Sequence, residues 1–298
     1  MRNAALATAL SFALVGCVST RIHGTPPSAA PAPTTRPAAQ DAPPADDMLN
    51  ATVWYQTALE RDLVYRTVYR AAAQRLPAAL ADKTWDALPK EDRTGSVKGL
   101  KPAIIVDVDE TVLDNAPSTV RQIRDGADFD NKEWGVWVSE RKAKPLAGAL
   151  EFLGDAAKQG VTVFYVTNRD VEQTADTVAN LRSAGFPVAS DEQVLARGTA
   201  LGGCAQNKEK SCRRQWVGRT HRVLMQFGDQ VGDFVRIAEN TPDGRRKVMA
   251  PYMDWVGERW FALPNPLYGS WESALYGKDD KTPAQRRTAK EAALDDAK

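Results

Sequence analysis

Residues 103–111 read AIIVDVDET, an apolar, largely β-branched run that follows Pro102 and ends in two aspartates, Asp107 and Asp109. A short unbroken run of this kind is typical of a strand that is buried on both faces. Such strands occur in parallel sheets covered by helices, and ligands bind beyond the carboxyl ends of the strands. We therefore expect Asp107 and Asp109 to lie at the ligand-binding edge of a mainly parallel sheet.

Two later apolar runs, at residues 161–166 and 222–227, predict two more buried strands. Each is followed directly by polar residues, as the first strand is. A single acidic pair after a strand would be weak evidence, because acidic residues often cap helices or occupy turns. Three such strand ends in one chain instead indicate a shared polar site. The second predicted strand is followed by Thr167, Asn168, Arg169 and Asp170, and the third by a stretch that contains Asp229 and Asp233.

The remaining pattern predicts helices between these strands. Apolar residues at helical spacing predict one long helix over residues 49–76, stopped by Pro77. Further helices are expected over residues 145–160 and 170–184, and a fourth strand at residues 260–263. Strands and helices that alternate in this way predict an α/β fold, with a mainly parallel sheet and helices on both of its faces.

Charge and composition limit the possible partners of the chain. In 298 residues, 39 basic side chains stand against 38 acidic ones, which leaves a formal net charge of +1. A chain so balanced has no overall field to hold a nucleic acid polymer. Any site for an anion must therefore be built locally.

The N-terminus resembles the signal peptide of a bacterial lipoprotein. Arg2 precedes an apolar run that is too short to span a membrane and ends in LVGC at residues 14–17, which resembles a lipobox. The alternative is an ordinary cleaved signal peptide. A lipidated Cys17 would anchor the chain to the membrane. Val18 stands where an acidic residue would favour the inner membrane, so we expect the outer membrane of a Gram-negative cell envelope.

Composition divides the rest of the chain into three parts. Residues 18–47 are rich in Pro and Ala, a composition typical of an extended tether. Residues 278–298 are charged and poor in large apolar side chains, and we expect a frayed helix or disorder there. Residues 48–277 remain as the folded domain.

Other chemistries fit the sequence poorly. A calcium loop of the EF-hand type would need glycine at its sixth position, where this chain has Val112. The two histidines, His23 and His221, give Cys204 and Cys212 no adequate partners for zinc, and His221 is expected at the surface or a strand edge. No Ser-His-Asp or Cys-His arrangement is visible. In an exported chain, a disulfide between Cys204 and Cys212 is the expected use of these cysteines.

Five stretches of the sequence resemble the class C bacterial acid phosphatases, a lipoprotein acid phosphatase and 5′-nucleotidase family of the haloacid dehalogenase (HAD) superfamily. Together they cover nearly everything from residue 49 to residue 276. The resemblance implies a HAD-like Rossmannoid sheet with a small helical cap. The stretches are IIVDVDETVLDN (104–115), Trp134 and Trp137 with PLAGALEF (145–152), VTNR (166–169), GDQVGDF (228–234) and LPNPLYGSW (263–271).

The resemblance also implies a reaction, the Mg²⁺-dependent hydrolysis of small phosphate esters. Asp107 would attack phosphorus and form an aspartyl-phosphate, and Asp109 would act first as general acid and then as general base. The metal would be bound by the Asp107 side chain, the Asp109 backbone carbonyl and Asp229. Asp233 would be a further ligand or would support the others.

Phosphoryl oxygens need donors as well as the metal. Thr167, Asn168 and nearby backbone N–H groups would supply them. A cation is also required, and the basic segment 208–214 lies where the family has its lysine. Lys210 is the expected residue, with Arg213 as the alternative.

The resemblance further implies which substrates are bound. Trp134 and Tyr268 would stack on a nucleobase, which favours nucleoside 5′-monophosphates; packing of a lid against the domain is the competing interpretation. Two other functions stay open from the sequence. One is a phosphotransferase with the same intermediate, and the other is a lipoprotein that binds phosphorylated ligands without turnover.

Overall fold

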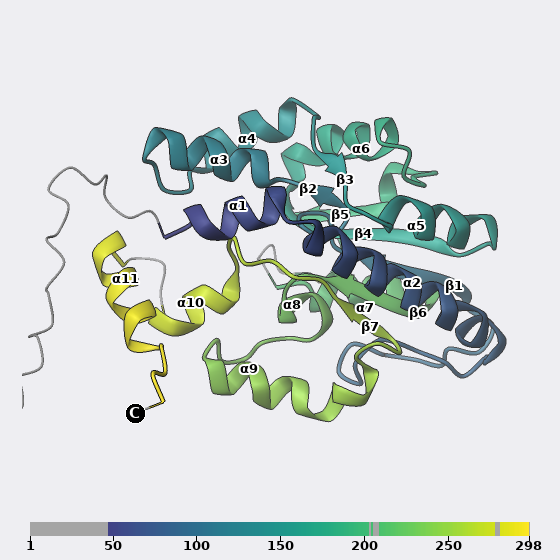
Figure 1. The fold of residues 1–298 in the computed structure, drawn as a ribbon. Helices are drawn as coiled ribbons and strands as arrows, with labels where there is room; N and C mark the ends of the chain where they lie inside the picture. The colour runs from purple at the N-terminus through teal and green to yellow at the C-terminus, as the bar shows by residue number, and fades with distance from the viewer. Residues whose placement is uncertain (1–46, 203, 205–208, 278–280, 298) are drawn as a thin grey trace, which may run out of the picture. The chain divides into compact units, whose positions relative to one another are not determined.

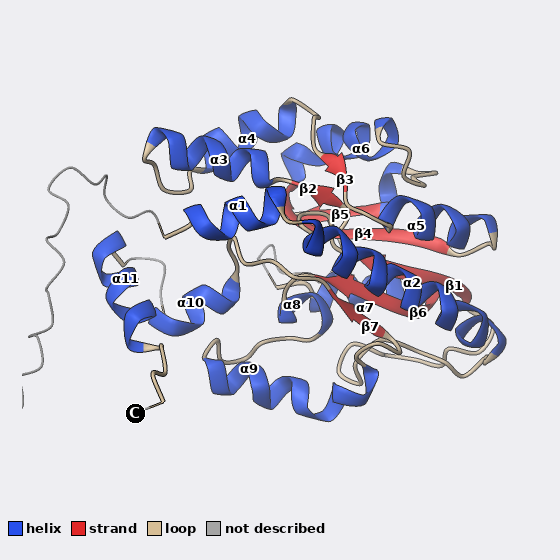
Figure 2. Cartoon of the chain, viewed as in Figure 1, coloured by secondary structure: helices blue, strands red, loops and turns tan. Residues whose placement is uncertain are grey.

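A computed structural model describes residues 47–202, 204, 209–277 and 281–297. The predicted signal peptide, Cys17 and almost all of the predicted tether lie outside the described residues. The core of the domain is a five-stranded sheet in the order β5-β4-β1-β6-β7, and every neighbouring pair is parallel (Figures 1 and 2). Its strands are β1 (Lys101–Val106), β4 (Thr162–Asp170), β5 (Val194–Arg197), β6 (His221–Gly228) and β7 (Trp260–Ala262).

The strand order places the expected ligand-binding edge at the end of β1. The chain runs outward from β1 to β4 and β5 on one side, then returns to place β6 and β7 on the other side. A reversal of this kind leaves a crevice at the carboxyl end of the central strand, where ligands bind in open α/β sheets. The predicted α/β fold is therefore confirmed, and Asp107 directly follows the central strand.

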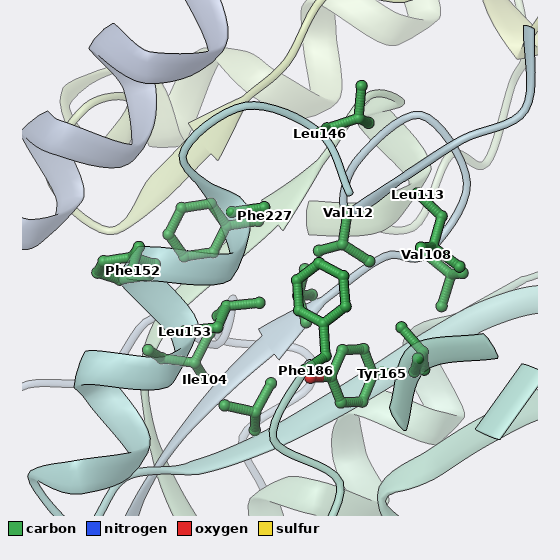
Figure 3. Packing of buried hydrophobic residues seen from close by; sticks show 14 of the residues in the cluster. Ile104, Val108, Val112, Leu113, Leu146, Phe152, Leu153, Tyr165, Phe186 and Phe227 are labelled. Carbon is green, nitrogen blue, oxygen red and sulfur yellow. The ribbon is translucent and has the colours of Figure 1, made fainter. Parts of the chain in front are cut away.

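Both faces of the sheet are covered, as the unbroken apolar run of β1 requires. Ile104 and Val106 belong to one buried cluster and Ala103 and Ile105 to the other, since alternate residues of a strand point to opposite faces. The first cluster includes side chains of α2 (Leu59–Ala81) and α5 (Ala149–Lys158), which pack against each other and the sheet. Figure 3 shows Phe152 and Leu153 of α5 within this cluster. The second includes Val217 of α7 (Ser211–Thr220).

A small helical insert lies between β1 and α5, as expected. It consists of α3 (Ala116–Asp125) and α4 (Asn131–Ser139), flanked by the short antiparallel pair β2 (Leu113–Asp114) and β3 (Lys144–Pro145). Helix α4 lies against α6 (Thr174–Ser183). The insert is thereby attached to the element that follows β4.

The prediction of a single N-terminal helix that stops at Pro77 is wrong in two respects. It is divided at Ala58, whose ψ of 124° is extended, into α1 (Leu49–Thr57) and α2. It also continues through Pro77 to Ala81. Proline leaves the carbonyl of Ala73 without its helical donor, but both residues are exposed, so water can satisfy that carbonyl.

Other boundaries differ because turns occupy positions predicted as helix. Pro145 belongs to β3, and α5 begins only after Gly148, which adopts the left-handed conformation at φ 83°. Strand β4 extends to Asp170, whose side chain caps a 3₁₀ turn before α6. Strand β5 was not predicted, because a four-residue segment carries too little periodicity to be recognised.

Four α-helices follow β6 among the described residues. No helix among the described residues is long and apolar enough to cross a membrane. Within the segment expected to be frayed or disordered, the structure has a helix, α11, capped by Thr282. The helices after β6 are α8 (Val231–Phe234), α9 (Pro242–Met249), α10 (Ser270–Tyr276) and α11 (Pro283–Ala292).

Candidate active site

Three carboxylates meet beyond the ends of β1 and β6. One oxygen each of Asp107, Asp229 and Asp233 lies within 4.8 Å of the others. Parallel pairing sets this arrangement, because the backbone N–H of Asp107 donates to the carbonyl of Phe227 at 3.0 Å, so the two strands end together. A tight turn returns Asp233 to the strand end, and any Cβ at position 228 would lie 2.3 Å from that of Asp233. Gly228 is therefore required for the cluster.

Lys210 joins two of these carboxylates. Its Nζ lies 2.6 Å from Asp107 Oδ1 and 2.6 Å from Asp233 Oδ1, and its side chain is buried. Arg213, the alternative cation, instead donates to the carbonyl of Thr167 and to Asn168 Oδ1 at 2.7 Å. Lys210 is thus the residue that the structure places against the acidic cluster.

Burial makes this cluster electrostatically unfavourable. Desolvation raises the pKa of Asp107 well above its usual range; Lys210 opposes the rise, and Asp233 and Asp229 add to it. Burial, with the charge of Asp233, raises the pKa of Asp229 to about 6. Burial lowers the pKa of Lys210, but the charges of Asp107 and Asp233 outweigh this and raise it. When all three carboxylates are ionised, the single ammonium of Lys210 leaves two negative charges in excess.

Asp109 is held away from this cluster by a different set of donors. Its Oδ1 accepts from Arg169 Nη2 at 2.8 Å, from Arg169 Nε at 3.0 Å and from Asn115 Nδ2 at 2.9 Å. Its Oδ2 has longer contacts, at 3.3 Å from Thr167 Oγ1 and 3.4 Å from Arg169 Nε. The carboxylate is therefore fixed mainly through one oxygen, and Oδ2 is the less engaged.

The sequence indicated Thr167 but gave Arg169 no role. Both reach Asp109 because they are two residues apart on β4 and so point to the same side. This two-residue spacing is the sequence pattern that could have indicated a role for Arg169 beside Thr167. Asn115 had no comparable signal: besides Asp109 it contacts Trp137, whose indole N–H donates to Asn115 Oδ1 at 2.8 Å.

Two side-chain amides that sequence reasoning also missed support Asp229. Gln230 Nε2 and Asn265 Nδ2 each donate to Asp229 Oδ2 at 2.8 Å. Asn265 lies in the loop after β7, 36 residues along the chain, so only the folded structure could reveal the contact. The loop is thereby attached to the acidic cluster.

Trp134 and Tyr268, the two aromatic residues expected to stack on a nucleobase, each contact a residue that binds a carboxylate of the site. The Arg169 guanidinium lies over the Trp134 ring, 5.6 Å from its centroid, and the same arginine binds Asp109. Tyr268 follows β7, and its backbone N–H donates to Asn265 Oδ1 at 3.4 Å. Both rings are partly buried and pack against the main core cluster.

Cys204 and Cys212 are joined by a disulfide in the structure. Cys212 lies in the first turn of α7, two residues after Lys210. His221 is at the opposite end of the sheet, where β6 begins, and burial followed by the charge of Lys101 lowers its pKa. The disulfide is therefore near the site and the histidine is not.

Comparison with known proteins identifies the relatives of this chain. Residues 52–271 match the family described as HAD superfamily, subfamily IIIB (acid phosphatase). The crystal structure of a class C acid phosphatase from Bacillus anthracis with tungstate bound is 32% identical, with a TM-score of 0.73 over 83% of this chain and 96% of that one.

Two plant proteins are also similar, over a shorter length. Acid phosphatase 1 of Solanum lycopersicum is 31% identical over 166 residues, which are 55% of this chain and 57% of that protein. The stem 31 kDa glycoprotein of Glycine max is 25% identical over 165 residues, 55% of this chain and 58% of that protein. The chain thus matches less than two thirds of the length of these relatives.

Proposed function

This chain belongs to subfamily IIIB of the HAD superfamily, the acid phosphatases, and from that membership we propose that it is a Mg²⁺-dependent phosphomonoesterase with Asp107 as its nucleophile. One observation carries the proposal. The two aspartates after β1 have different partners: Asp107 contacts Lys210 in the acidic cluster, and Asp109 is held outside it by Arg169 and Asn115. The proposed mechanism needs this difference in contacts, because one aspartate acts as the nucleophile and the other as the acid/base.

The acidic cluster fits Mg²⁺. Mg²⁺ prefers oxygen ligands and is bound in proteins through one or two carboxylates, and the oxygens of Asp107, Asp229 and Asp233 are close enough to share one ion. The excess of two negative charges matches a divalent cation. When bound, the ion would neutralise the repulsion between the nucleophile and an anionic ester.

The reaction then uses two side chains in turn. A carboxylate oxygen of Asp107 attacks phosphorus, the bond to the leaving oxygen breaks, and Asp109 gives that oxygen a proton. Asp109 next takes a proton from water as the water oxygen attacks phosphorus, which releases phosphate and regenerates Asp107. We assign the proton to Asp109 Oδ2, since Oδ1 already accepts three short hydrogen bonds.

The phosphoryl oxygens would be bound by groups at the ends of β4 and the start of α7. Thr167 Oγ1 lies 3.3 Å from Asp109 Oδ2, and Asn168 is the next residue of β4. Lys210 Nζ already contacts the nucleophile and can donate to an oxygen on the phosphorus that Asp107 attacks.

For substrates, we propose nucleoside 5′-monophosphates among the small phosphate esters. Trp134 lies under the guanidinium of Arg169, which binds Asp109, and Tyr268 lies in the loop whose Asn265 binds Asp229. A phosphotransferase with the same intermediate is the second candidate, and product analysis with added alcohol separates the two. A binding protein without turnover would not need the acid/base carboxylate that Arg169 and Asn115 hold in place.

Hydrolysis of a simple aryl phosphate, with Mg²⁺ and with a chelator, tests the proposal. Wild-type protein should hydrolyse the ester only with Mg²⁺, and Asp107→Asn should be inactive but folded. Asp155→Asn is the matched control, because Asp155 is an exposed carboxylate of α5 whose ion pair is with Lys158. Near-normal turnover by Asp107→Asn would refute the mechanism.

We also propose that the protein is anchored in the cell envelope through Cys17, on the sequence pattern alone. Membrane fractionation of a Cys17→Ser variant tests the anchor: the variant should leave the membrane fraction and keep its activity.

A further inference from the structure

One ion pair close to the site is not used by the proposed mechanism. Arg214 belongs to the same basic segment as Lys210, but it is fully buried and its Nε donates to Asp92 Oδ2 at 2.6 Å. Asp92 is also fully buried and comes from the segment between α2 and β1, outside every motif of the sequence. A buried pair of this kind contributes little net stability, which leaves its purpose to be explained.

The guanidinium of Arg214 fixes the backbone that carries Asp233. Its Nη1 donates to the carbonyl of Gly232 at 2.9 Å and to that of Asp233 at 3.1 Å. These two residues lie in the single turn of α8, which returns Asp233 to the end of β6. The position of Asp233 relative to the cluster therefore depends on Arg214.

Asp92 fixes the start of α7, which presents Lys210. The hydroxyl of Ser211, the next residue after Lys210, donates to Asp92 Oδ1. Gln215 Nε2 donates to the same oxygen at 3.3 Å, one turn further along the helix. The first turn of α7 is thus attached to the same carboxylate that holds Arg214.

We propose that Asp92 and Arg214 are positioning residues that set the distance between Lys210 and Asp233 and so determine the affinity of the acidic cluster for Mg²⁺. Lys210 and Asp233 are 2.6 Å apart, and each is attached to one side of the buried pair. Loss of the pair would let α7 and α8 move independently. The inference rests on the proposed Mg²⁺ dependence.

The test is the affinity of the metal-free, full-length protein for Mg²⁺ without substrate, measured by titration calorimetry below the melting temperature of each variant. Arg214→Lys keeps a charge near Asp92 but cannot reproduce the fork to the two carbonyls. We expect about 10- to 100-fold weaker binding, as is usual when support of a metal ligand is lost. If Arg214→Lys does not fold, Ser211→Ala serves as a milder variant, and it should also weaken Mg²⁺ binding.

Arg222→Lys is the matched control. Arg222 is also a buried arginine, and its Nη1 donates to the carbonyls of Ala79 and Asp82, but it lies at the start of β6, at the opposite end from the site. Its substitution should cost comparable stability and change Mg²⁺ affinity by no more than about twofold.

Three results would overturn the inference, and they are distinguishable. Unchanged affinity in both Arg214→Lys and Ser211→Ala would show that the pair does not position the cluster. An equal loss in Arg222→Lys would show general loosening of the domain. Wild-type protein that does not bind Mg²⁺ would refute the proposed function, and this inference with it.

Discussion

Trp134 lies under the guanidinium that holds Asp109, so its ring could serve either a nucleobase or the packing of Arg169. The two roles have different kinetic consequences. Stacking on a base contributes only when the substrate has a ring, whereas packing of Arg169 affects every substrate through Asp109.

We predict that Trp134→Ala raises the KM for a nucleoside 5′-monophosphate by about 5- to 150-fold, the range that corresponds to roughly 1 to 3 kcal/mol of stacking. The KM for an alkyl phosphate should hardly change. Trp134→Phe, which keeps a ring, is the control and should behave nearly as wild type. Equal losses for both substrates would identify the tryptophan as part of a structural lid.

At the residue scale, the sequence located acidic groups better than their partners. Asp107, Asp229 and Asp233 were recognisable because each follows a buried strand or its turn, and the structure brings them within 4.8 Å. Asn265 and Asn115 were not, since a neutral amide in a loop looks the same whether it faces water or a carboxylate. Their roles depend on contacts that form only in the folded chain.

At the scale of elements, the ends of helices were the least predictable feature. The break at Ala58 has no sequence signal comparable to glycine or proline, and Pro77 is tolerated because its face of α2 is exposed. The strands β1, β4 and β6 were predicted within a few residues, because largely apolar runs buried on both faces leave little ambiguity.

Helix α7 has a covalent constraint at its first turn. The disulfide between Cys204 and Cys212 closes a short loop directly beside Lys210. In the loop-entropy model, such a bridge is worth about 2 to 3 kcal/mol. We predict that replacing both cysteines with serine lowers the free energy of unfolding by this amount, measured in urea.

Reduced wild-type protein should unfold at the same urea concentration as the double variant, which makes it the internal control. Mass spectrometry of the non-reduced protein provides an independent check. Two free thiols in the mature protein would contradict the bridge.

At the scale of the whole molecule, the acidic cluster makes stability depend on pH. The pKa of Asp229 is 3.8 when unfolded and about 6 when folded without metal, so the folded state holds its proton more tightly. That contribution is fully present below pH 3.8 and is lost as the pH rises through about 6. The metal-free protein should therefore lose stability over this range from this group.

Bound Mg²⁺ should reverse this loss of stability at higher pH, because the ion binds only the deprotonated carboxylates. We predict that Mg²⁺ at about 100 times its dissociation constant raises the Tm by roughly 5 to 10 °C at pH 7 and by much less at pH 5. Differential scanning calorimetry at the two pH values measures this, with Asp229→Asn as the control. An equal rise at both pH values would argue against a metal site in the cluster.

If Asp107 carries the phosphoryl group during turnover, that group can be detected on its side chain. Protein mixed with a phosphate ester and Mg²⁺ is quenched in acid, digested and analysed by mass spectrometry, with Asp109→Asn included because loss of the base should slow release. We expect one added phosphoryl group on Asp107 and none in Asp107→Asn. A phosphoryl group on another residue, or steady turnover without a phosphorylated peptide, would contradict it.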